Sequence, residues 1–279
     1  MILVMGATGP GTGNIGRTVV HQLVAAGRPV RALSRDPGRA VRLPDGVEVV
    51  KGDLGRPETL HTAFKGVDRM YMMAIDGWGV LEPETAAEVL DVARGAGVRH
   101  VVLLSASDNP LVEVEEPLRA SGLDWTFLRP GEFAVNTADY WGPSIRDKGE
   151  VQDAYLDVRG VPIHEADVAA VAVTALLEDG HVGAIYTMTG PESLSRRDQV
   201  RAIGAALGRD ISIKDVTPEK VRVMMIDRGW PGEVVDHIFN YFSAWVDNPP
   251  EVLSTVEEVT GRPARTYAQW ADDHVMDFR

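Results

Sequence analysis

Three side chains near the middle of the chain, Ser105, Glu132 and Tyr140, are of types that can give or take a proton. Ser105 follows the most apolar run of the sequence, so its hydroxyl is predicted at the end of a strand. Glu132 interrupts an apolar stretch, where burial would raise the pKa of its carboxyl and let it act as an acid. Tyr140 follows Asn136 on a predicted helix and could donate to a carbonyl oxygen. Each also has a structural alternative: a strand-end cap, a solvated turn and core packing.

The strongest motif is a glycine-rich stretch behind the apolar residues 2–5. Residues 11–16 match the pattern GxGxxG, and a helix is predicted over 15–26. The unpaired N–H groups of a helix N-terminus, together with the helix dipole, make such a loop a cradle for phosphate. The expected contact residues are Gly6, Thr8, Gly9, Gly11, Thr12, Gly13, Asn14 and Ile15. A second glycine pattern overlaps the first, so the loop is lengthened, and residues 10–12 are predicted to bulge outward.

Apolar runs alternate with helical patterns through the first half of the chain. Strands are predicted at 2–5, 29–33, 47–51, 69–73, 98–104 and 125–128, and helices at 15–26, 57–64, 83–96 and 111–121. This alternation is typical of βαβ units. Right-handed crossovers then give an α/β fold with a doubly wound, mainly parallel Rossmann sheet in the order 3-2-1-4-5-6.

The second half is less regular and mostly helical from residue 218 onward. Helices are predicted at 133–141, 165–178 and 195–207, and strands at 150–156, 184–188 and 211–216. A capping-box spacing from Ser195 to Asp198 opens the third of these helices. We expect residues 1–132 to form the dinucleotide-binding core. Residues 133–279 would complete the sheet and form a small, mostly helical C-terminal substrate lobe, intimate with the core. Its late aromatic residues would pack that lobe or wall a substrate cleft.

The composition of the chain restricts the classes of molecule that we expect it to bind. The formal charge of −13 argues against nucleic acid and against an anionic membrane surface, since both are bound by neutralising phosphates with Lys and Arg. The chain has no cysteine, which removes disulfides and thiolate chemistry. Neither a leader pattern nor an apolar run of membrane-spanning length is visible, so a cytoplasmic location is expected. The scattered histidines predict no metal site.

Several short motifs, in order and over nearly the whole chain, give a resemblance to a known family. The chain resembles the NmrA-like family of atypical short-chain dehydrogenase/reductases. The motifs that carry the resemblance are the glycine loop, Ser34-Arg35-Asp36-Pro37, Gly52-Asp53-Leu54, residues 100–105 (HVVLLS), residues 125–131 (WTFLRPG) with Asn136, residues 165–169 (EADVA), and residues 183–192 (GAIYTMTGPE). The resemblance implies a Rossmann fold that binds NAD(P). It also implies membership of a family that contains quinone, azo-dye and isoflavone-type reductases as well as regulators with little catalysis.

The cofactor preference is predicted from the end of the second strand. An NAD site has a carboxylate there, whereas this chain has Arg35, whose guanidinium suits the 2′-phosphate of NADP(H). The neighbouring carboxylate of Asp36 is a feature of NAD(H) sites, but Arg35 leads us to predict a preference for NADP(H) over NAD(H). The resemblance places further cofactor contacts at the ends of the next strands. They are Asp53, Leu54, Met73, Ala74 and Ser105.

Conventional short-chain dehydrogenases use a Tyr-x-x-x-Lys pair as the proton donor, and this pair is absent from the helix predicted at 111–121. Ser105, Tyr140 and Glu132 remain as catalytic candidates. A second group is expected to line the substrate pocket. Its members are Asp76, Trp78, Phe133, Asn136 and His164.

Three functions are consistent with the sequence. The favoured one is an NADPH-dependent reductase of a small quinone, enone or carbonyl compound, because hydride transfer depends mainly on positioning and a quinone can take protons from a weak acid. The alternatives are a non-catalytic NADP(H)-sensing regulator of a protein partner, and a repurposed enzyme of redox-neutral cyclisation or isomerisation in a biosynthetic pathway. The expected substrate is a small, aromatic or quinone-like molecule, and a homodimer or a protein partner stays open.

Overall fold

The computed structural model describes residues 1–9, 15–40, 43–76, 79–106 and 110–279. The chain divides into two compact units. Unit 1 comprises Met1–Gly131, Glu165–Met188 and Thr255–Arg262, and unit 2 comprises Glu132–His164, Thr189–Ser254 and Pro263–Arg279.

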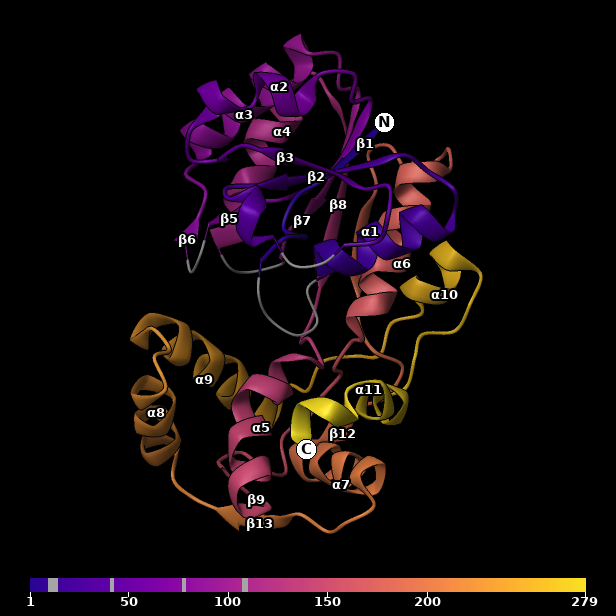
Figure 1. The fold of residues 1–279 in the computed structure, drawn as a ribbon. Coiled ribbons are helices and arrows are strands. Elements are labelled where there is room, and N and C mark those ends of the chain that lie inside the picture. The colour runs from indigo at the N-terminus through magenta and orange to yellow at the C-terminus, as the bar shows by residue number, and fades with distance from the viewer. Residues whose placement is uncertain (10–14, 41–42, 77–78, 107–109) are drawn as a thin grey trace. The chain divides into compact units, whose positions relative to one another are not determined.

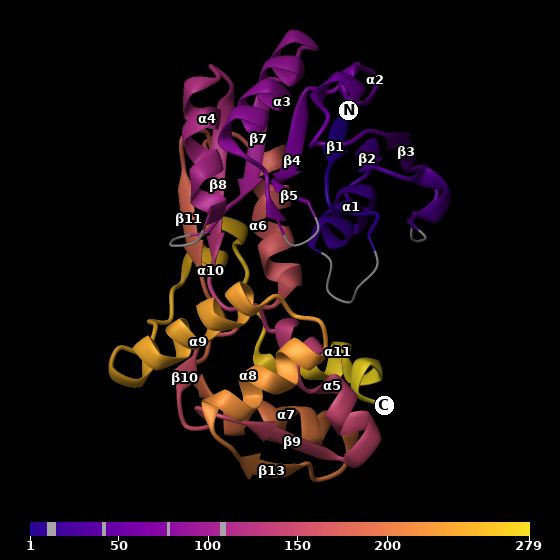
Figure 2. The same ribbon diagram turned by 90° about the vertical axis from the view of Figure 1, so that its left-hand side faces the viewer.

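Unit 1 is built on a seven-stranded parallel sheet in the order β3-β2-β1-β4-β7-β8-β11 (Figures 1 and 2). Its strands are β1 (Ile2–Val4), β2 (Val30–Ser34), β3 (Glu48–Lys51), β4 (Arg69–Met73), β7 (His100–Leu104), β8 (Asp124–Pro130) and β11 (Ile185–Met188). The predicted order of the first six strands is confirmed. The strand predicted at 184–188 is β11, which adds the seventh position beside β8.

Helices cover both faces of this sheet. Figure 1 shows α2, α3 and α4 grouped on one face and α1, α6 and α10 on the other. Their bounds are α1 (Ile15–Ala25), α2 (His61–Phe64), α3 (Pro83–Gly95), α4 (Glu115–Ala120), α6 (Glu165–Leu177) and α10 (Thr255–Thr260). A short 3-10 turn, η1 (Pro37–Arg39), follows β2. Two more, η2 (Pro57–Thr59) and η3 (Pro110–Val114), precede α2 and α4. The single helix predicted at 111–121 is therefore wrong in detail: it is a 3-10 turn followed by the short α4.

The central strands are apolar because both faces of the sheet are covered. All five residues of β7 and all three of β1 are buried, and apart from His100 at the start of β7 these strands are apolar without alternation. A two-stranded hairpin of β5 (Ile75–Asp76) and β6 (Gly79–Val80) follows β4. Parallel strands end together at one edge, so the segments after β1, β2, β4 and β7 gather there.

Unit 2 is mostly helical. Its helices are α5 (Asn136–Lys148), α7 (Arg196–Leu207), α8 (Pro218–Asp227), α9 (Gly232–Asp247), α11 (Tyr267–Asp273) and the 3-10 turn η4 (Val275–Phe278). Two small sheets join them, namely β9 (Glu150–Asp153) with β13 (Ser212–Asp215) and β10 (Arg159–Gly160) with β12 (Leu194–Ser195). Figure 2 labels β9, β10 and β13, and Figure 1 labels β12. The helix predicted at 133–141 begins three residues later and runs to Lys148, where Gly149 in the left-handed conformation ends it. The capping box at Ser195 is confirmed.

Large aromatic side chains form the core of unit 2. Trp141, Tyr267, Trp270 and Phe278 are buried together with aliphatic residues of β9 and α7. A second, smaller cluster centres on Met225 and its neighbours on α8 and α9. No helix in the described part of the chain is long and apolar enough to span a membrane.

Candidate functional site

The described part of the glycine loop has the close packing that a dinucleotide site requires. Gly6 has a φ of +73°, and a Cβ there would lie 2.5 Å from Met73 Cε. A Cβ on Gly16 would lie 2.5 Å from the carbonyl oxygen of Met5, so only glycine lets α1 start this close to β1. Arg17 Nη2 donates to the carbonyl of Gly9 at 2.7 Å and ties the loop to α1.

Other predicted contact residues lie around this loop. Thr8 Oγ1 donates to the carbonyl of Leu33 at 3.2 Å, and Ile15 is the first residue of α1. The predicted contacts at Gly11, Thr12, Gly13 and Asn14, and with them the predicted bulge at 10–12, lie outside the described residues.

The segments after β2 and β3 carry the predicted adenosine contacts. Arg35 is exposed directly after β2. Asp36 Oδ1 accepts from the N–H of Gly38, so this carboxylate caps η1. Asp53 Oδ1 likewise accepts from the N–H of Gly55, while Leu54 is half-buried beside it. After β4, Ala74 is fully buried.

Ser105 follows β7 and belongs to a buried ionic cluster in unit 1. Its Oγ donates to Glu115 Oε1 at 2.6 Å. Arg129 donates to both oxygens of Glu115, at 2.8 and 2.6 Å, and Arg119 Nη2 donates to Oε2 at 2.9 Å. A hydroxyl has a single hydrogen, so while Ser105 donates to Glu115 it offers any other group only an acceptor oxygen.

The charge of Glu115 is fixed by this cluster. Burial raises the pKa of Glu115, but hydrogen bonds from Arg129 and Ser105 and the positive charges of Arg129 and Arg119 outweigh burial and hold the pKa below its usual range. Glu115 is therefore ionised at neutral pH and is no source of protons.

Glu132 differs from Glu115 in its hydrogen bonding and in the direction of its pKa shift. Its side chain is 8% exposed, and its Oε2 has no hydrogen-bond partner among the described residues. Burial raises the pKa of Glu132 to about 7; the charge of Arg196 opposes this rise and that of Asp153 adds to it. The predicted raised pKa has the physical cause the sequence suggested, and Glu132 can carry a proton near neutrality.

Arg196, the first residue of α7, connects Glu132 to a buried ion pair. Its Nε and Nη2 donate to Asp153 Oδ2 at 3.1 and 2.7 Å, and its Nη1 lies 3.7 Å from Glu132 Oε1. Trp141 Nε1 and the N–H of Ala154 also donate to Asp153. Asp153 is thus satisfied as a carboxylate, whereas Glu132 has only a distant cation.

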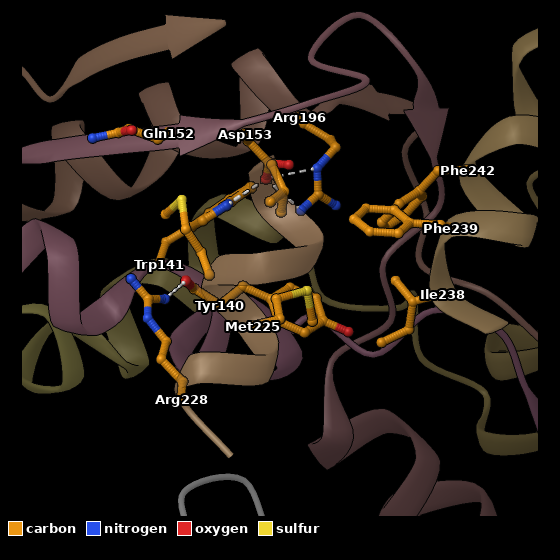
Figure 3. A pocket seen from close by; sticks show the side chains of 12 residues that line it. Tyr140, Trp141, Gln152, Asp153, Arg196, Met225, Arg228, Ile238, Phe239 and Phe242 are labelled. Carbon is orange, nitrogen blue, oxygen red and sulfur yellow. Dashed lines mark hydrogen bonds and ion pairs between the residues drawn. The ribbon is translucent and has the colours of Figure 1, made fainter. Parts of the chain in front are cut away.

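Aromatic rings surround Arg196 and line a recess (Figure 3). Its guanidinium carbon lies 4.4 Å from the ring centre of Phe242, 4.7 Å from Trp141 and 5.9 Å from Tyr140. The space inside the recess that the centre of a water-sized sphere can occupy is about 20 Å³, which is room for about one water molecule. Further lining side chains are Gln152, Asp153, Val221, Met224, Met225, Arg228, Ile238 and Phe239. Burial raises the pKa of Tyr140, so its phenol is neutral.

The structure brings Glu132 and Tyr140 to the same arginine. Tyr140 lines the recess, whereas Glu132 and the predicted pocket residues Phe133, Asn136 and His164 are not among its lining residues. Phe133 pairs with Ile163 in an isolated bridge, and Asn136 begins α5. His164 is buried with Nε2 3.3 Å from Asp273 Oδ2. Asp76 lies in β5, and Trp78 lies outside the described residues. No cluster of three or more metal-ligating side chains is found in the part of the chain that is described.

Sequence reasoning missed Arg196, Asp153 and Glu115. The spacing from Glu115 to Arg119 is a visible i,i+4 ion pair on one helix face. No comparable signal exists for Arg196 and Asp153, which are separated by 42 intervening residues and meet only in the folded unit.

Comparisons with known proteins fit this arrangement. Residues 11–117 match a family model described as NAD(P)H-binding. The chain is 36% identical, over all of its length and 99% of the relative's, to (4-alkanoyl-5-oxo-2,5-dihydrofuran-3-yl)methyl phosphate reductase from Streptomyces griseus. It is also 36% identical, with the same coverage, to NAD(P)H azoreductase from Xenophilus azovorans. The chain belongs to the NmrA-like family of atypical short-chain dehydrogenase/reductases.

Solved structures agree with the fold of an NmrA-like protein. The NADPH complex of the quinone oxidoreductase QOR2 from Escherichia coli has a TM-score of 0.81 at 23% identity and covers 99% of this chain and 100% of its own. The glycines at 6 and 16, with no room for a Cβ, fit the backbone approach that a pyrophosphate requires. Unit 1 is therefore an NAD(P)-binding domain.

Proposed function

We propose that this NmrA-like protein is an NADPH-dependent reductase of a small quinone, enone or carbonyl compound. The observation that carries the proposal is the identity of 36% with two reductases along the entire chain. One of them acts on a 5-oxo-2,5-dihydrofuran that carries an alkanoyl group, which is a conjugated carbonyl compound. The other is an azoreductase. A conjugated, planar acceptor is common to both.

NADPH is the proposed cofactor, in preference to NADH. Arg35 stands directly after β2, where a 2′-phosphate would be bound. Asp36, the nearest carboxylate in sequence, uses Oδ1 to cap η1. We expect Arg35→Ala to raise the KM for NADPH by at least about tenfold, the loss of one charged hydrogen-bond pair, with little change for NADH. Steady-state rates with each cofactor measure this, and equal losses for both would contradict the NADPH preference.

Three groups of the protein have different roles in the proposed reaction. Bound NADPH supplies a hydride to the acceptor. Glu132 supplies the proton that the acceptor needs, because its carboxyl can be protonated near neutral pH. Ser105 is assigned to the cofactor side as a hydrogen-bond acceptor, since its hydrogen is donated to Glu115. Tyr140 contributes a neutral ring wall.

The test is the oxidation of NADPH, followed by absorbance, with a panel of quinones, enones, aldehydes and azo dyes. Turnover of a conjugated ketone is the expected result. Tight NADPH binding without turnover of any acceptor would contradict the reductase and favour the sensor alternative. Calorimetric absence of NADPH binding would contradict both and favour redox-neutral chemistry.

A further inference from the structure

The seven-stranded sheet of unit 1 has two edges, and these edges differ in charge. β3 forms one edge and β11 forms the other (Figure 2). β3 begins with Glu48 and ends with Lys51, and both side chains are exposed. Charged side chains of this kind hinder an edge strand from pairing with another chain. β11 has the sequence Ile-Tyr-Thr-Met and lacks this protection.

The uncharged segment extends beyond β11 on both sides. Residues 180–191 include no Asp, Glu, Lys or Arg, although 25% of the residues of the chain are charged. The formal charge of −13 makes two copies of this chain repel each other. At β11 a second copy can approach without bringing like charges of the paired strands together.

Exposed apolar surface of unit 1 gathers at the same edge. Among the large apolar side chains of unit 1 that the structure describes, the exposed ones are Val182, just before β11, and Ile185, at 56% and 43%. Ile185 is in register with Phe127 and Thr187 with Arg129, so both lie on the face of the sheet where α4 contacts these two residues of β8. The short α4 leaves Ile185 and Thr187 exposed, and burial of this apolar surface would favour association.

The backbone of β11 presents hydrogen-bonding groups at this edge. The carbonyl of Ala184 accepts from the N–H of Phe127 on β8. Backbone groups alternate between the two sides of a strand, so those of Ile185 and Thr187 point away from β8. β11 is the last strand of the sheet, and no other strand in the described part of the chain pairs with it there. These outward N–H and carbonyl groups match the edge of another β-strand.

We propose that β11 joins two copies of this chain into a twofold-symmetric dimer, in which the two β11 strands pair antiparallel about an axis at Tyr186. Ile185 of each copy then lies opposite Thr187 of the other, and these two residues exchange both of their backbone hydrogen bonds. The same two residues supply the donors and the acceptors in both copies. The pairing is therefore self-complementary, as a twofold interface requires.

This interface lies away from the cofactor site of each copy. β8, β7 and β4 separate β11 from β1 in the sheet order. Neighbouring strands lie about 4.8 Å apart, so β11 is about 19 Å from β1 and the glycine loop behind it. Each copy keeps its own NAD(P) site in the dimer, and the proposal is independent of the proposed reductase function.

Sedimentation equilibrium of the full chain measures the association. The expected species has twice the mass of the 30.3 kDa chain. Its dissociation constant should be on the order of 10 μM, as for interfaces at the small end of the size range. Ile185→Lys gives β11 a charge like that of Lys51 on β3 and should raise the dissociation constant at least about tenfold. The matched control is Val223→Lys, at a 56% exposed residue of unit 2, which changes the net charge equally and should associate as the wild type does.

A second pair of variants tests the backbone hydrogen bonds. Thr187→Pro removes an N–H that points away from β8, so the sheet within one copy keeps its hydrogen bonds. The dimer loses one hydrogen bond from each copy, and its dissociation constant should rise at least about tenfold. Thr187→Val keeps the N–H and should associate as the wild type does. Circular dichroism shows whether each variant is folded, and if Ile185→Lys does not fold, the two Thr187 variants decide.

Disulfide cross-linking tests the register, because the chain has no cysteine of its own. Tyr186 lies opposite Tyr186 of the second copy in a non-hydrogen-bonded pair, with Cα atoms about 4.5 Å apart, which a disulfide can bridge. The two copies of Ile185 are diagonal neighbours, with Cα atoms about 7–8 Å apart, which is too far. Under mild oxidation, Tyr186→Cys should form a disulfide-linked dimer, whereas Ile185→Cys should stay unlinked.

Three results would each overturn the interface. They are a monomer at about 100 μM, association that neither Ile185→Lys nor Thr187→Pro weakens, and equal cross-linking of the two cysteine variants. Equal weakening by Val223→Lys and Ile185→Lys would also overturn it, because association would then follow the net charge. All of these measurements are made without turnover, so their failure leaves the reductase proposal standing.

Discussion

Glu115 in unit 1 and Glu132 in unit 2 are both buried carboxyl groups near arginines, yet the two have opposite electrostatics. Glu115 accepts hydrogen bonds from Ser105 and two arginines, whereas Glu132 Oε2 has no partner among the described residues. The pKa of Glu115 lies below its usual range, while burial raises that of Glu132 to about 7. The two pKa values differ because the arginine beside each glutamate has a different ion-pair partner. Arg129 forms its ion pair with Glu115, whereas Arg196 forms its close ion pair with Asp153.

The contrast distinguishes a carboxylate that stabilises the fold from a carboxyl group that can exchange a proton near neutral pH. A charge that is fully hydrogen-bonded holds its surroundings in one arrangement and has no proton to exchange. A carboxyl whose pKa lies near the working pH can take and give a proton with little energetic penalty. We therefore propose different tasks for the two glutamates, and we expect their substitution to change stability with opposite dependences on pH.

The largest expected effect is the loss of stability in Glu115→Gln. The substitution leaves two arginines facing an amide inside unit 1, and we expect it to lower the free energy of unfolding by about 4 kcal/mol at pH 7. The pKa of Glu115 is lower in the folded state, so its contribution is full above the unfolded pKa and is lost as pH falls through the folded pKa. Urea unfolding at several pH values measures this.

The exposed neighbour provides the control for that substitution. Glu116 is 81% exposed beside the same Arg119, and Glu116→Gln should change stability by no more than about 0.5 kcal/mol. Similar losses in the two variants would mean that the buried cluster has no special role.

Glu132→Gln should show the reverse dependence on pH. The folded-state pKa of Glu132 is raised, so its contribution to stability is full below the unfolded value and is lost as pH rises through about 7. Between pH 5 and pH 8.5 the variant should gain about 3 kcal/mol relative to the wild type, which corresponds to a shift of a little over two pKa units. A stability difference that does not change over this range would show that Glu132 is ionised throughout.

The catalytic effect of Glu132→Gln is expected to be slightly smaller in free energy. Loss of the acid should lower kcat with a quinone or enone about 100-fold, or about 2.7 kcal/mol, while NADPH affinity stays unchanged. The kcat of the wild type should fall above pH 7, and that of the variant should not. Single-turnover rates of NADPH oxidation test this against Glu116→Gln, and a variant with full kcat would remove Glu132 from the reaction.

The fold could be predicted because its signals are local. Apolar runs at β1, β4 and β7 and the glycines at 6 and 16 each reflect constraints within a few residues, and the strand order follows from crossover handedness. The misplaced α5 and the divided helix at 110–120 are boundary errors, since neighbouring packing decides where a helix begins.

Only some residues of the candidate site around Glu132 could be predicted from the sequence. Glu132 was visible as a charge in an apolar stretch, and burial explains its pKa. Arg196 and Asp153 were not visible, because each is an ordinary surface residue type in sequence and their pairing exists only through the packing of α7 on β9 and α5. The hydrogen-bond partner of Ser105 was not visible for the same reason: Glu115 is ten residues away, and the sequence does not show which way the Ser105 hydrogen points.

Substitution of Ser105 tests the contrast between Glu115 and Glu132 through the smallest expected effect. Ser105→Ala removes one hydrogen bond to a buried carboxylate and should cost about 1.5 kcal/mol of stability, because Glu115 keeps its arginines. In the Glu115→Gln background the same substitution should cost much less, and a double-mutant cycle measures that coupling. Since the Ser105 hydrogen is held by Glu115, the substitution should weaken NADPH binding rather than remove a proton donor, so the pH dependence of kcat should keep the Glu132 profile. A shift of that profile in Ser105→Ala, or full additivity with Glu115→Gln, would return Ser105 to the role of a direct catalytic acid.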